Sequence, residues 1–169
     1  RLDCAVTNEM LKDEHYDAVV FCNGTREGVP PIKGIDKVRY VQATDLLVKP
    51  DLLGEAKKVV VVGGGAVGVE TAYFLSYEKG CKVKVVEMLP YFIDGACTAN
   101  RGHLIHYLEE NGGELINCAK VVEFDEGTVR ISRNISAGVP DPYCTWSPVL
   151  PKNIENPLAK KIGPETYVQ

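Results

Sequence analysis

Residues 58–68 constrain the fold of this chain more than any other stretch. They comprise a lysine, four consecutive valines and the sequence Gly-Gly-Gly-Ala-Val-Gly. β-Branched residues favour strands, and an unbroken apolar run is typical of a strand buried on both faces of a parallel sheet. Gly63, Gly65 and Gly68 fit the pattern G-x-G-x-x-G, and residues 69–77 predict a helix. A strand, a glycine turn and a helix in this order indicate a dinucleotide-binding unit.

Each glycine of this motif has its own predicted role. Gly63 allows a tight turn that a β-carbon would make costly. Gly65 lets the backbone approach a pyrophosphate, and Gly68 lets the helix pack closely on the strand. The helix N-terminus then presents unpaired N–H groups and a partial positive charge to the phosphates. The predicted cofactor contacts of this turn are Gly63, Gly64, Gly65, Ala66, Val67 and Gly68.

A second predicted strand, residues 82–87, ends in an acid. Glu87 follows the glycine turn by roughly 20 residues, the interval at which an Asp or Glu accepts hydrogen bonds from the adenosine ribose diol. None of the next six residues, beginning with Met88, is basic. A 2′-phosphate would meet a carboxylate there with no cation nearby, which favours NAD(H) over NADP(H). Glu87 and Met88 therefore join the predicted cofactor contacts.

The composition argues against several other classes of protein. The 169 residues carry a formal net charge of −4 without a basic run, so we expect no nucleic-acid partner. No apolar stretch approaches the length of a membrane span, so no membrane partner is expected either. The six cysteines contain no C-x-x-C pair, which argues against a redox disulfide, a zinc site and an iron–sulfur cluster. Their number in a chain without secretory features indicates a reducing, cytoplasmic setting.

Short elements are predicted upstream of the valine strand. Residues 2–6 alternate as in a short strand, and residues 16–22 give a stronger strand signal. Residues 38–41 predict another short strand. Residues 43–48 and a segment beginning at Pro50 predict helical turns.

Downstream of Glu87 the pattern predicts a helix, a third strand and a hairpin. Thr98 is a favourable N-cap for a helix that ends at Glu110, before an Asn-Gly-Gly stop. Residues 114–118 predict the third strand, and residues 119–124 and 128–132 alternate around Asp-Glu-Gly as in a hairpin. A fourth strand is predicted at 144–150 and an extended segment at 165–169. The expected fold is α/β: a Rossmann-like three-layer domain with a small parallel sheet in the order 3-2-1-4 and an antiparallel β-ribbon at the third crossover.

Three stretches carry a resemblance to a known family. They are Tyr-Asp-Ala-Val-Val-Phe-Cys-Asn-Gly-Thr from Tyr16, Pro-Ile-Lys-Gly from Pro31, and Gly-Gly-Gly-Ala-Val-Gly-Val-Glu ending at Glu70. They resemble the NADH:flavin oxidoreductases that include 2-enoate and 2,4-dienoyl-CoA reductases, in the pyridine nucleotide-disulfide oxidoreductase superfamily. The resemblance implies that Glu70 lies by the nicotinamide ribose and that Val121 lies beside the adenine. It is weakest after Ser132.

The resemblance also implies a division of the chain within a larger protein. Residues 1–26 would be a remnant of an FAD domain, 27–57 a connecting segment, 58–150 the NAD(H)-binding domain and 151–169 a return segment toward the FAD domain. The expected function is to bind NADH and present it for hydride transfer to FAD. That FAD would be held by the remaining flavin domains of the same polypeptide. The isolated fragment is expected to be inactive, and no side chain in it is predicted to be catalytic.

Two alternative functions stay open. The chain could be an NAD-sensing module without electron transfer, or it could take FAD or another adenosine nucleotide at the same glycine turn. Individual residues also have plainer interpretations. Without the resemblance, a solvated first-turn carboxylate is the preferred interpretation of Glu70. A buried thiol is preferred for Cys22, and a core position is preferred for Trp146. His103 and His106 can share a helix face, but no further ligands are evident, so no metal site is predicted.

The chain departs from the family pattern at two places. The segment between Ala72 and Gly80 is one residue longer than the common pattern, so the end of that helix is expected to bulge. Residues 145–151 stand where the family has an Ala-x-Gly turn.

Overall fold

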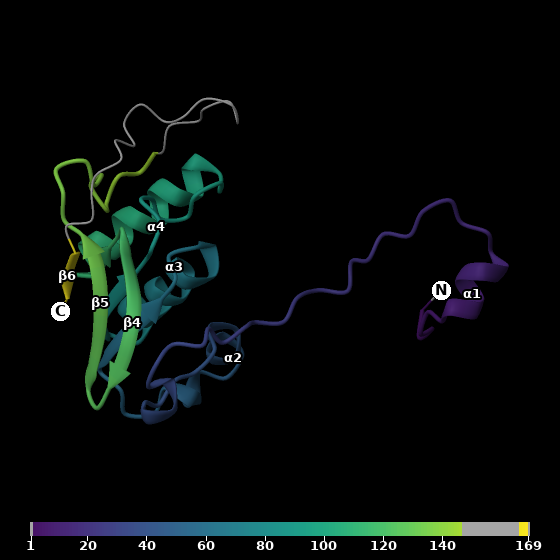
Figure 1. Cartoon of the computed structure of the whole chain (residues 1–169), viewed down its shortest axis with the longest axis horizontal. Coiled ribbons are helices and arrows are strands. Elements are labelled where there is room, and N and C mark those ends of the chain that lie inside the picture. The colour runs from purple at the N-terminus through teal and green to yellow at the C-terminus, as the bar shows by residue number, and fades with distance from the viewer. Residues whose placement is uncertain (1, 147–165, 169) are drawn as a thin grey trace.

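A small parallel sheet forms the centre of the domain. The structure is a computed structural model that describes residues 2–146 and 166–168 (Figure 1). The sheet contains β1 (Lys58–Val62), β2 (Lys82–Val86) and β3 (Glu114–Ile116) in the order β1-β2-β3. β1 pairs with β2 along its whole length, from Lys58 opposite Lys82 to Val62 opposite Val86. These findings confirm the α/β class and the 3-2-1 part of the predicted strand order.

Two helices pack against this sheet. Two residues of α3 (Ala66–Tyr73) and two of α4 (Thr98–Glu110) are fully buried in one core with Val83 and Val85 of β2. They are Val69 and Ala72 of α3, and Ile105 and Leu108 of α4. The predicted N-cap of α4 is wrong by one position. Thr98 is the first helical residue, and Cys97 is the N-cap, without a side-chain hydrogen bond. Cys97, with φ −55° and ψ 131°, stays outside the helix and follows a turn in which the Ala96 N–H donates to the Ile93 carbonyl.

The end of the helix after β1 bulges as predicted. A π-helical turn, Phe74–Glu78, follows α3 directly, and the Lys79 N–H donates to the Phe74 carbonyl at 3.2 Å. A π-turn absorbs one extra residue without breaking the helix. The longer segment between Ala72 and Gly80 is therefore accommodated inside the helix itself.

The predicted hairpin is present, and it begins beside the C-terminal ends of β2 and β3, where the Ala119 N–H donates to the Glu87 carbonyl. β4 (Ala119–Asp125) pairs antiparallel with β5 (Thr128–Asn134), and β5 pairs with β6 (Thr166–Val168). β6 confirms the extended segment predicted near the chain end. A second core lies between this ribbon and the parallel sheet, formed by Val86, Ile116, Ala119, Val121, Phe124 and Ile131.

Among the described residues before β1 the helices are short, and Lys33 forms an isolated β-bridge with Glu123. The predicted helical turns are present as α2 (Ala43–Val48) and a 3₁₀ helix, Pro50–Leu53, and another 3₁₀ helix spans Ile35–Lys37. The strand predicted at 38–41 is wrong. This stretch passes beside β1 without pairing to it, and Arg39 instead donates to the Leu52 carbonyl at 2.6 Å.

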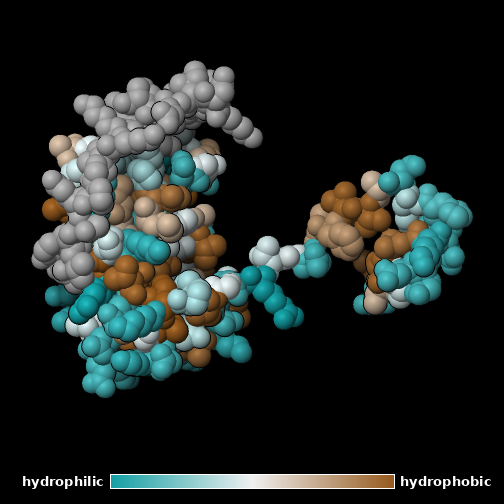
Figure 2. All heavy atoms as spheres, in the orientation of Figure 1, coloured by the Kyte–Doolittle hydropathy of each residue, from teal (hydrophilic) through white to brown (hydrophobic). Residues whose placement is uncertain are grey.

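Both strands predicted near the N-terminus are also wrong. Residues 2–6 lead into α1 (Asn8–Asp13), whose N-cap Thr7 accepts from the Met10 N–H, and residues 16–22 belong to no strand. A strand needs a neighbour for its backbone groups, and no described strand reaches this segment, which Figure 1 shows well away from the sheet. Its apolar side chains stay exposed, Val20 to 83% and Phe21 to 77%, as the brown surface of this part shows in Figure 2.

The predicted fourth strand is not seen where the structure describes it. Residues 144–146 are outside any strand, and 147–150 lie outside the described residues. The chain just before them is attached at β3, the edge opposite β1. The Tyr143 hydroxyl donates to the Gly113 carbonyl, and Arg101 of α4 donates to the Cys144 carbonyl.

The outer edge of β1 therefore faces no strand within the described residues. This also corrects the prediction that β1 is buried on both faces. Val59 and Val61 are partly buried, whereas Val60 and Val62 are exposed. Between residues 2 and 146, and in β6, no helix has the length and apolar character needed to cross a membrane.

Candidate functional site

The turn after β1 is built on two glycines that the fold requires. Gly63 has φ +107°, a conformation that L side chains rarely adopt, and its N–H donates to the Val86 carbonyl at 2.9 Å. A β-carbon on Gly68 would overlap the carbonyl oxygen of Gly63. The tight turn predicted for Gly63 and the close helix packing predicted for Gly68 are both confirmed.

Gly65 is a glycine for which the fold gives no reason. It is the N-cap of α3, with φ −70° and ψ −178°, which is extended backbone open to any residue. A β-carbon built there would meet nothing within 4 Å. The first helical hydrogen bond runs from the Val69 N–H to the Gly65 carbonyl at 3.0 Å.

The start of α3 offers free donors next to Gly65. No described residue accepts a hydrogen bond from the N–H groups of Ala66, Val67 or Gly68, and no side chain caps the helix. Ala66 and Val67 are exposed. Free N–H groups and the positive end of the helix dipole favour a bound anion here.

Glu87 lies against the glycine turn although it follows it by roughly 20 residues. One carboxylate oxygen accepts from the Gly64 N–H at 2.6 Å, and the other accepts from the Leu89 N–H at 2.7 Å. The side chain is mostly buried, with 8% exposed. An ionised carboxylate oxygen can accept more than one hydrogen bond, so each retains acceptor capacity toward a ligand hydroxyl. The structure thus brings the predicted turn and the predicted acid together.

The other predicted contacts differ in accessibility. Met88 is exposed next to Glu87, whereas Val121 in β4 is only 6% exposed within the second core. Glu70 is exposed on α3, and its carboxylate makes no hydrogen bond or ion pair with a described residue. Its interpretation as a first-turn carboxylate is wrong, since the first turn of α3 contains no acid.

The two histidines, Cys22 and Trp146 have interpretations without a ligand, and the structure places each of them. His106 lies 3.4 Å from Glu110, and His103 contacts the Tyr107 ring with centroids 4.5 Å apart. The described part of the chain contains no group of three or more His, Cys, Asp or Glu suited to a metal ion. Two core assignments are wrong, because Cys22 is exposed and Trp146 is 59% exposed. Cys22 and Trp146 each lie in a stretch that is predicted to be a strand and that pairs with no described strand.

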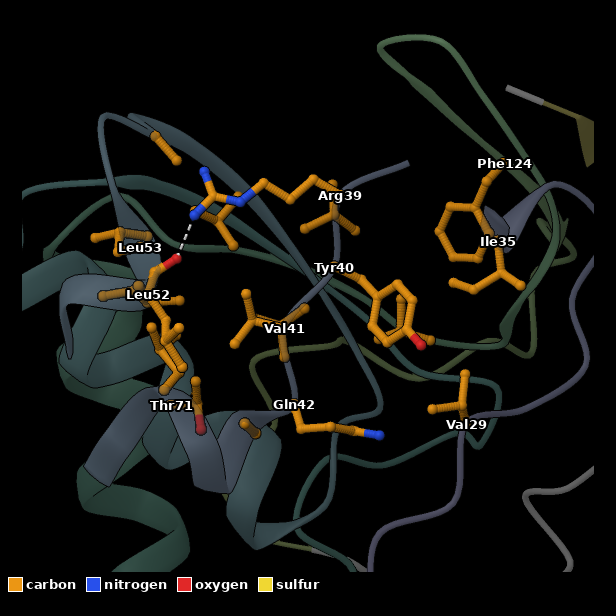
Figure 3. A pocket seen from close by; sticks show the side chains of 18 of the residues that line it. Val29, Ile35, Arg39, Tyr40, Val41, Gln42, Leu52, Leu53, Thr71 and Phe124 are labelled. Carbon is orange, nitrogen blue, oxygen red and sulfur yellow. Dashed lines mark hydrogen bonds between the residues drawn. The ribbon is translucent and has the colours of Figure 1, made fainter. Parts of the chain in front are cut away.

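A cavity of about 340 Å³ lies beside β1 but apart from the glycine turn. Figure 3 shows its walls, which come from residues 28–56, β1, α3 and β4, with Arg39 bonded to the Leu52 carbonyl. None of residues 63–68, Glu87 and Met88 line it. It occupies the edge at which the predicted fourth strand would have paired, so we do not assign it to the cofactor.

Sequence reasoning missed two residues of the site. Phe92 and Ile93, in the loop between β2 and α4, contact Gly64 from the side opposite the solvent. Nothing in the local pattern of residues 88–96 indicates this contact, because it joins two loops that are distant in sequence.

The parallel sheet, the glycine turn that begins a helix and the acid at the end of the second strand together define a Rossmann-like dinucleotide domain. The family model described as pyridine nucleotide-disulphide oxidoreductase matches residues 3–138, and this chain belongs to that family. NAD(H) and FAD are the cofactors of the family.

The chain is similar to several reductases and oxidases. It is 33% identical to a bilirubin reductase of Mediterraneibacter gnavus, over 76% of this chain and 20% of the relative. It is 34% identical to a cinnamate reductase of Clostridium sporogenes, over 66% and 16%. An NADH oxidase of Thermoanaerobacter brockii is 44% identical over 43% and 11%. The chain therefore spans a fifth or less of the length of these relatives.

Solved structures agree on the fold. A 2-naphthoyl-CoA reductase matches with a TM-score of 0.61 at 24% identity, over 80% of this chain and 20% of that chain. An HOCl-induced flavoprotein disulfide reductase of Escherichia coli matches with a TM-score of 0.52 at 26% identity, over 67% and 26%.

Proposed function

We propose that this chain binds NADH and presents it for hydride transfer to FAD in a larger, enoate-reductase-like oxidoreductase. The proposed contacts are Gly63, Gly64, Gly65, Ala66, Val67, Gly68, Glu70, Glu87, Met88 and Val121. The cofactors supply the hydride chemistry, and this chain binds and orients the nucleotide. No side chain of the chain is proposed as an acid, a base or a nucleophile.

The observation that carries this proposal is Gly65. Its backbone conformation accepts any residue, and the space where its β-carbon would lie is open. Glycine loses more conformational entropy on folding than any other residue, so a glycine that the fold does not require is destabilising. Its presence at this position supports close approach by a ligand. The free N–H groups of Ala66, Val67 and Gly68 stand next to it and suit a pyrophosphate.

Glu87 supports NADH in preference to NADPH. Its carboxylate is fixed by the Gly64 and Leu89 N–H groups and keeps acceptor capacity for a ribose diol. A 2′-phosphate at the same place would be repelled by the carboxylate, and residues 88–93 contain no cation to compensate.

The relatives support the finer assignment. A cinnamate reductase and a bilirubin reductase are among them, and each is several times longer than the matched region. We propose the divisions 1–26, 27–57, 58–150 and 151–169 given above, with FAD held by the parts of the protein that this chain does not contain. Free cysteines, including the exposed Cys4 and Cys22, support a reducing, cytoplasmic setting.

Calorimetric titration of the chain with NADH, NADPH and FAD tests the proposal. We expect NADH to bind most tightly and FAD to bind weakly. Tight FAD binding without NADH binding would overturn the proposal in favour of an FAD domain at the same turn. Glu87→Ser combined with Met88→Arg should shift the preference toward NADPH. Thermal unfolding of that variant is the control, because Glu87 also holds Gly64.

A further inference from the structure

The loop between β2 and α4 contacts the N–H, the carbonyl and the α-carbon side of Gly64. The Gly64 N–H donates to Glu87 at 2.6 Å, and the Gly64 carbonyl accepts from the Ile93 N–H at 2.7 Å. A β-carbon on Gly64 would overlap the ring of Phe92 and lie 2.8 Å from the Glu87 β-carbon. Gly64 is therefore enclosed by one neighbouring loop, while Gly65, the next residue, is open.

Phe92 and Ile93 are themselves fixed. Phe92 is fully buried and Ile93 is 2% exposed, and both belong to the core beneath α3 and α4. Ile93 has φ +50°, which is a rare and costly conformation for a β-branched residue. Such a conformation persists where the surrounding contacts over-determine it, and it directs the Ile93 N–H at Gly64.

The position of Gly64 sets the position of the donors after it. Gly65 is the N-cap of α3, and the free N–H groups of Ala66 and Val67 follow immediately. Gly64 offers no free N–H of its own, because Glu87 takes it. Its contribution is to fix the turn between β1 and these donors, and the same contact fixes the Glu87 carboxylate.

We propose that Phe92 and Ile93 are positioning residues for the dinucleotide, acting on the phosphate donors of α3 through Gly64. The inference rests on the proposed NADH binding. A turn that is already fixed in its binding conformation loses less conformational entropy when the ligand binds. A substitution that makes the turn more mobile therefore weakens affinity without removing any ligand contact. The affinity of the chain for NADH thus depends on the β2–α4 loop as well as on the glycine motif.

The first test compares Phe92→Leu with Leu108→Ala in the full 169-residue chain. Leu108 is equally buried, belongs to the same core and lies on α4 away from the turn. We expect Phe92→Leu to raise the Kd for NADH about tenfold, and Leu108→Ala to change it less than about twofold while lowering the unfolding temperature. Equal effects on Kd, or no effect of Phe92→Leu, would overturn the inference. If Phe92→Leu does not fold, Phe92→Met, whose flexible side chain can fill part of the space left by the ring, replaces it.

The second test is a rescue. Gly64→Ala should weaken NADH binding because its β-carbon overlaps the Phe92 ring. The double variant Gly64→Ala with Phe92→Leu should bind NADH more tightly than Gly64→Ala alone, since the smaller side chain makes room. Strictly additive losses in this cycle would show that the ring does not act through Gly64.

Hydrogen exchange without ligand separates this inference from the proposed function. The amides of Gly64 and Ile93 should exchange faster in Phe92→Leu than in the unchanged chain, and Leu108→Ala should leave them slow. Absence of NADH binding to the unchanged chain would overturn the proposed function and the cofactor role of the loop. NADH binding that is insensitive to Phe92→Leu would overturn the present inference alone.

Discussion

Two alanine substitutions in the glycine turn should separate folding from binding. Gly68→Ala places a methyl group against the backbone of Gly63, whereas Gly65→Ala places it in open space. We expect Gly68→Ala to lower stability and Gly65→Ala to lower NADH affinity with stability nearly unchanged. The pair is matched, because both positions belong to one motif and receive the same side chain.

The cost at Gly68 follows from the overlap with the Gly63 carbonyl. Forcing an extra methyl group into a packed contact costs about 1–3 kcal/mol. Because the overlapped atoms belong to the backbone, the cost lies at the upper end of this range. Alanine recovers about 1 kcal/mol as a better helix former than glycine, so the net loss is about 2 kcal/mol. For a chain of this size each kcal/mol corresponds to roughly 2–4 °C, which gives a decrease of about 4–8 °C in Tm.

The two stability terms at Gly65 nearly cancel. Replacing glycine by alanine at a permitted conformation gains about 0.4–1 kcal/mol through the unfolded chain. Alanine is a poorer N-cap than glycine by a similar amount, so the net change is within about 0.5 kcal/mol. The methyl group projects beside the free N–H groups of Ala66 and Val67, where a pyrophosphate would approach. We expect at least about a tenfold increase in the Kd for NADH.

Thermal unfolding by circular dichroism and calorimetric titration with NADH measure both quantities on the same samples. The reasoning fails if Gly65→Ala lowers Tm as much as Gly68→Ala does. It also fails if Gly65→Ala leaves the Kd for NADH unchanged, because the open space would then have no ligand to accommodate.

Three further predictions follow from single contacts. Glu87→Ala should lower the free energy of unfolding by about 2–3 kcal/mol in urea titrations, because the buried Gly64 N–H loses its acceptor. The hydrogen bond from Lys33, with the nearby charge of Arg130, lowers the pKa of Glu123. The stability gap between the unchanged chain and Glu123→Gln should therefore be complete above the ordinary carboxyl pKa and close as pH falls through the lowered one. Burial raises the pKa of the Cys118 thiol, and the charge of Arg133 opposes this increase only in part. Iodoacetamide should therefore label Cys118 only at a higher pH than it labels an ordinary cysteine, and mass spectrometry measures the labelled fraction.

Features set by neighbouring residues in sequence were predictable. The valine run, the glycine spacing and the helix start lie within one short stretch, and the structure has strand, turn and helix there. The hairpin around Asp-Glu-Gly and the bulge after Ala72 are equally local. In each case the residue types and their spacing determine the backbone conformation.

Features that need a distant partner were not predictable. Residues 16–22 have the composition of a strand, but strand formation depends on a partner, and this segment pairs with none of the described strands. Residues 144–146 fail as a strand for a related reason, since Arg101 and Tyr143 attach this region at β3.

The candidate site shows the same division. Spacing alone placed Glu87 with the glycine turn, because the end of β2 adjoins the end of β1 in a parallel sheet. It did not reveal that Phe92 and Ile93 enclose Gly64. A positive φ at an isoleucine contradicts local preference, and only the packing of the assembled core explains it.

The outer edge of β1, which pairs with no strand among the described residues, has a consequence for handling the protein. Four valines in a row, with one side that no described strand covers, form a template onto which another extended chain can add. Lys57 and Lys58 place positive charge at only one end of this template. As long as the edge stays bare, the chain should self-associate with rising concentration. A peptide that covers β1 should suppress this, and light scattering would record the difference.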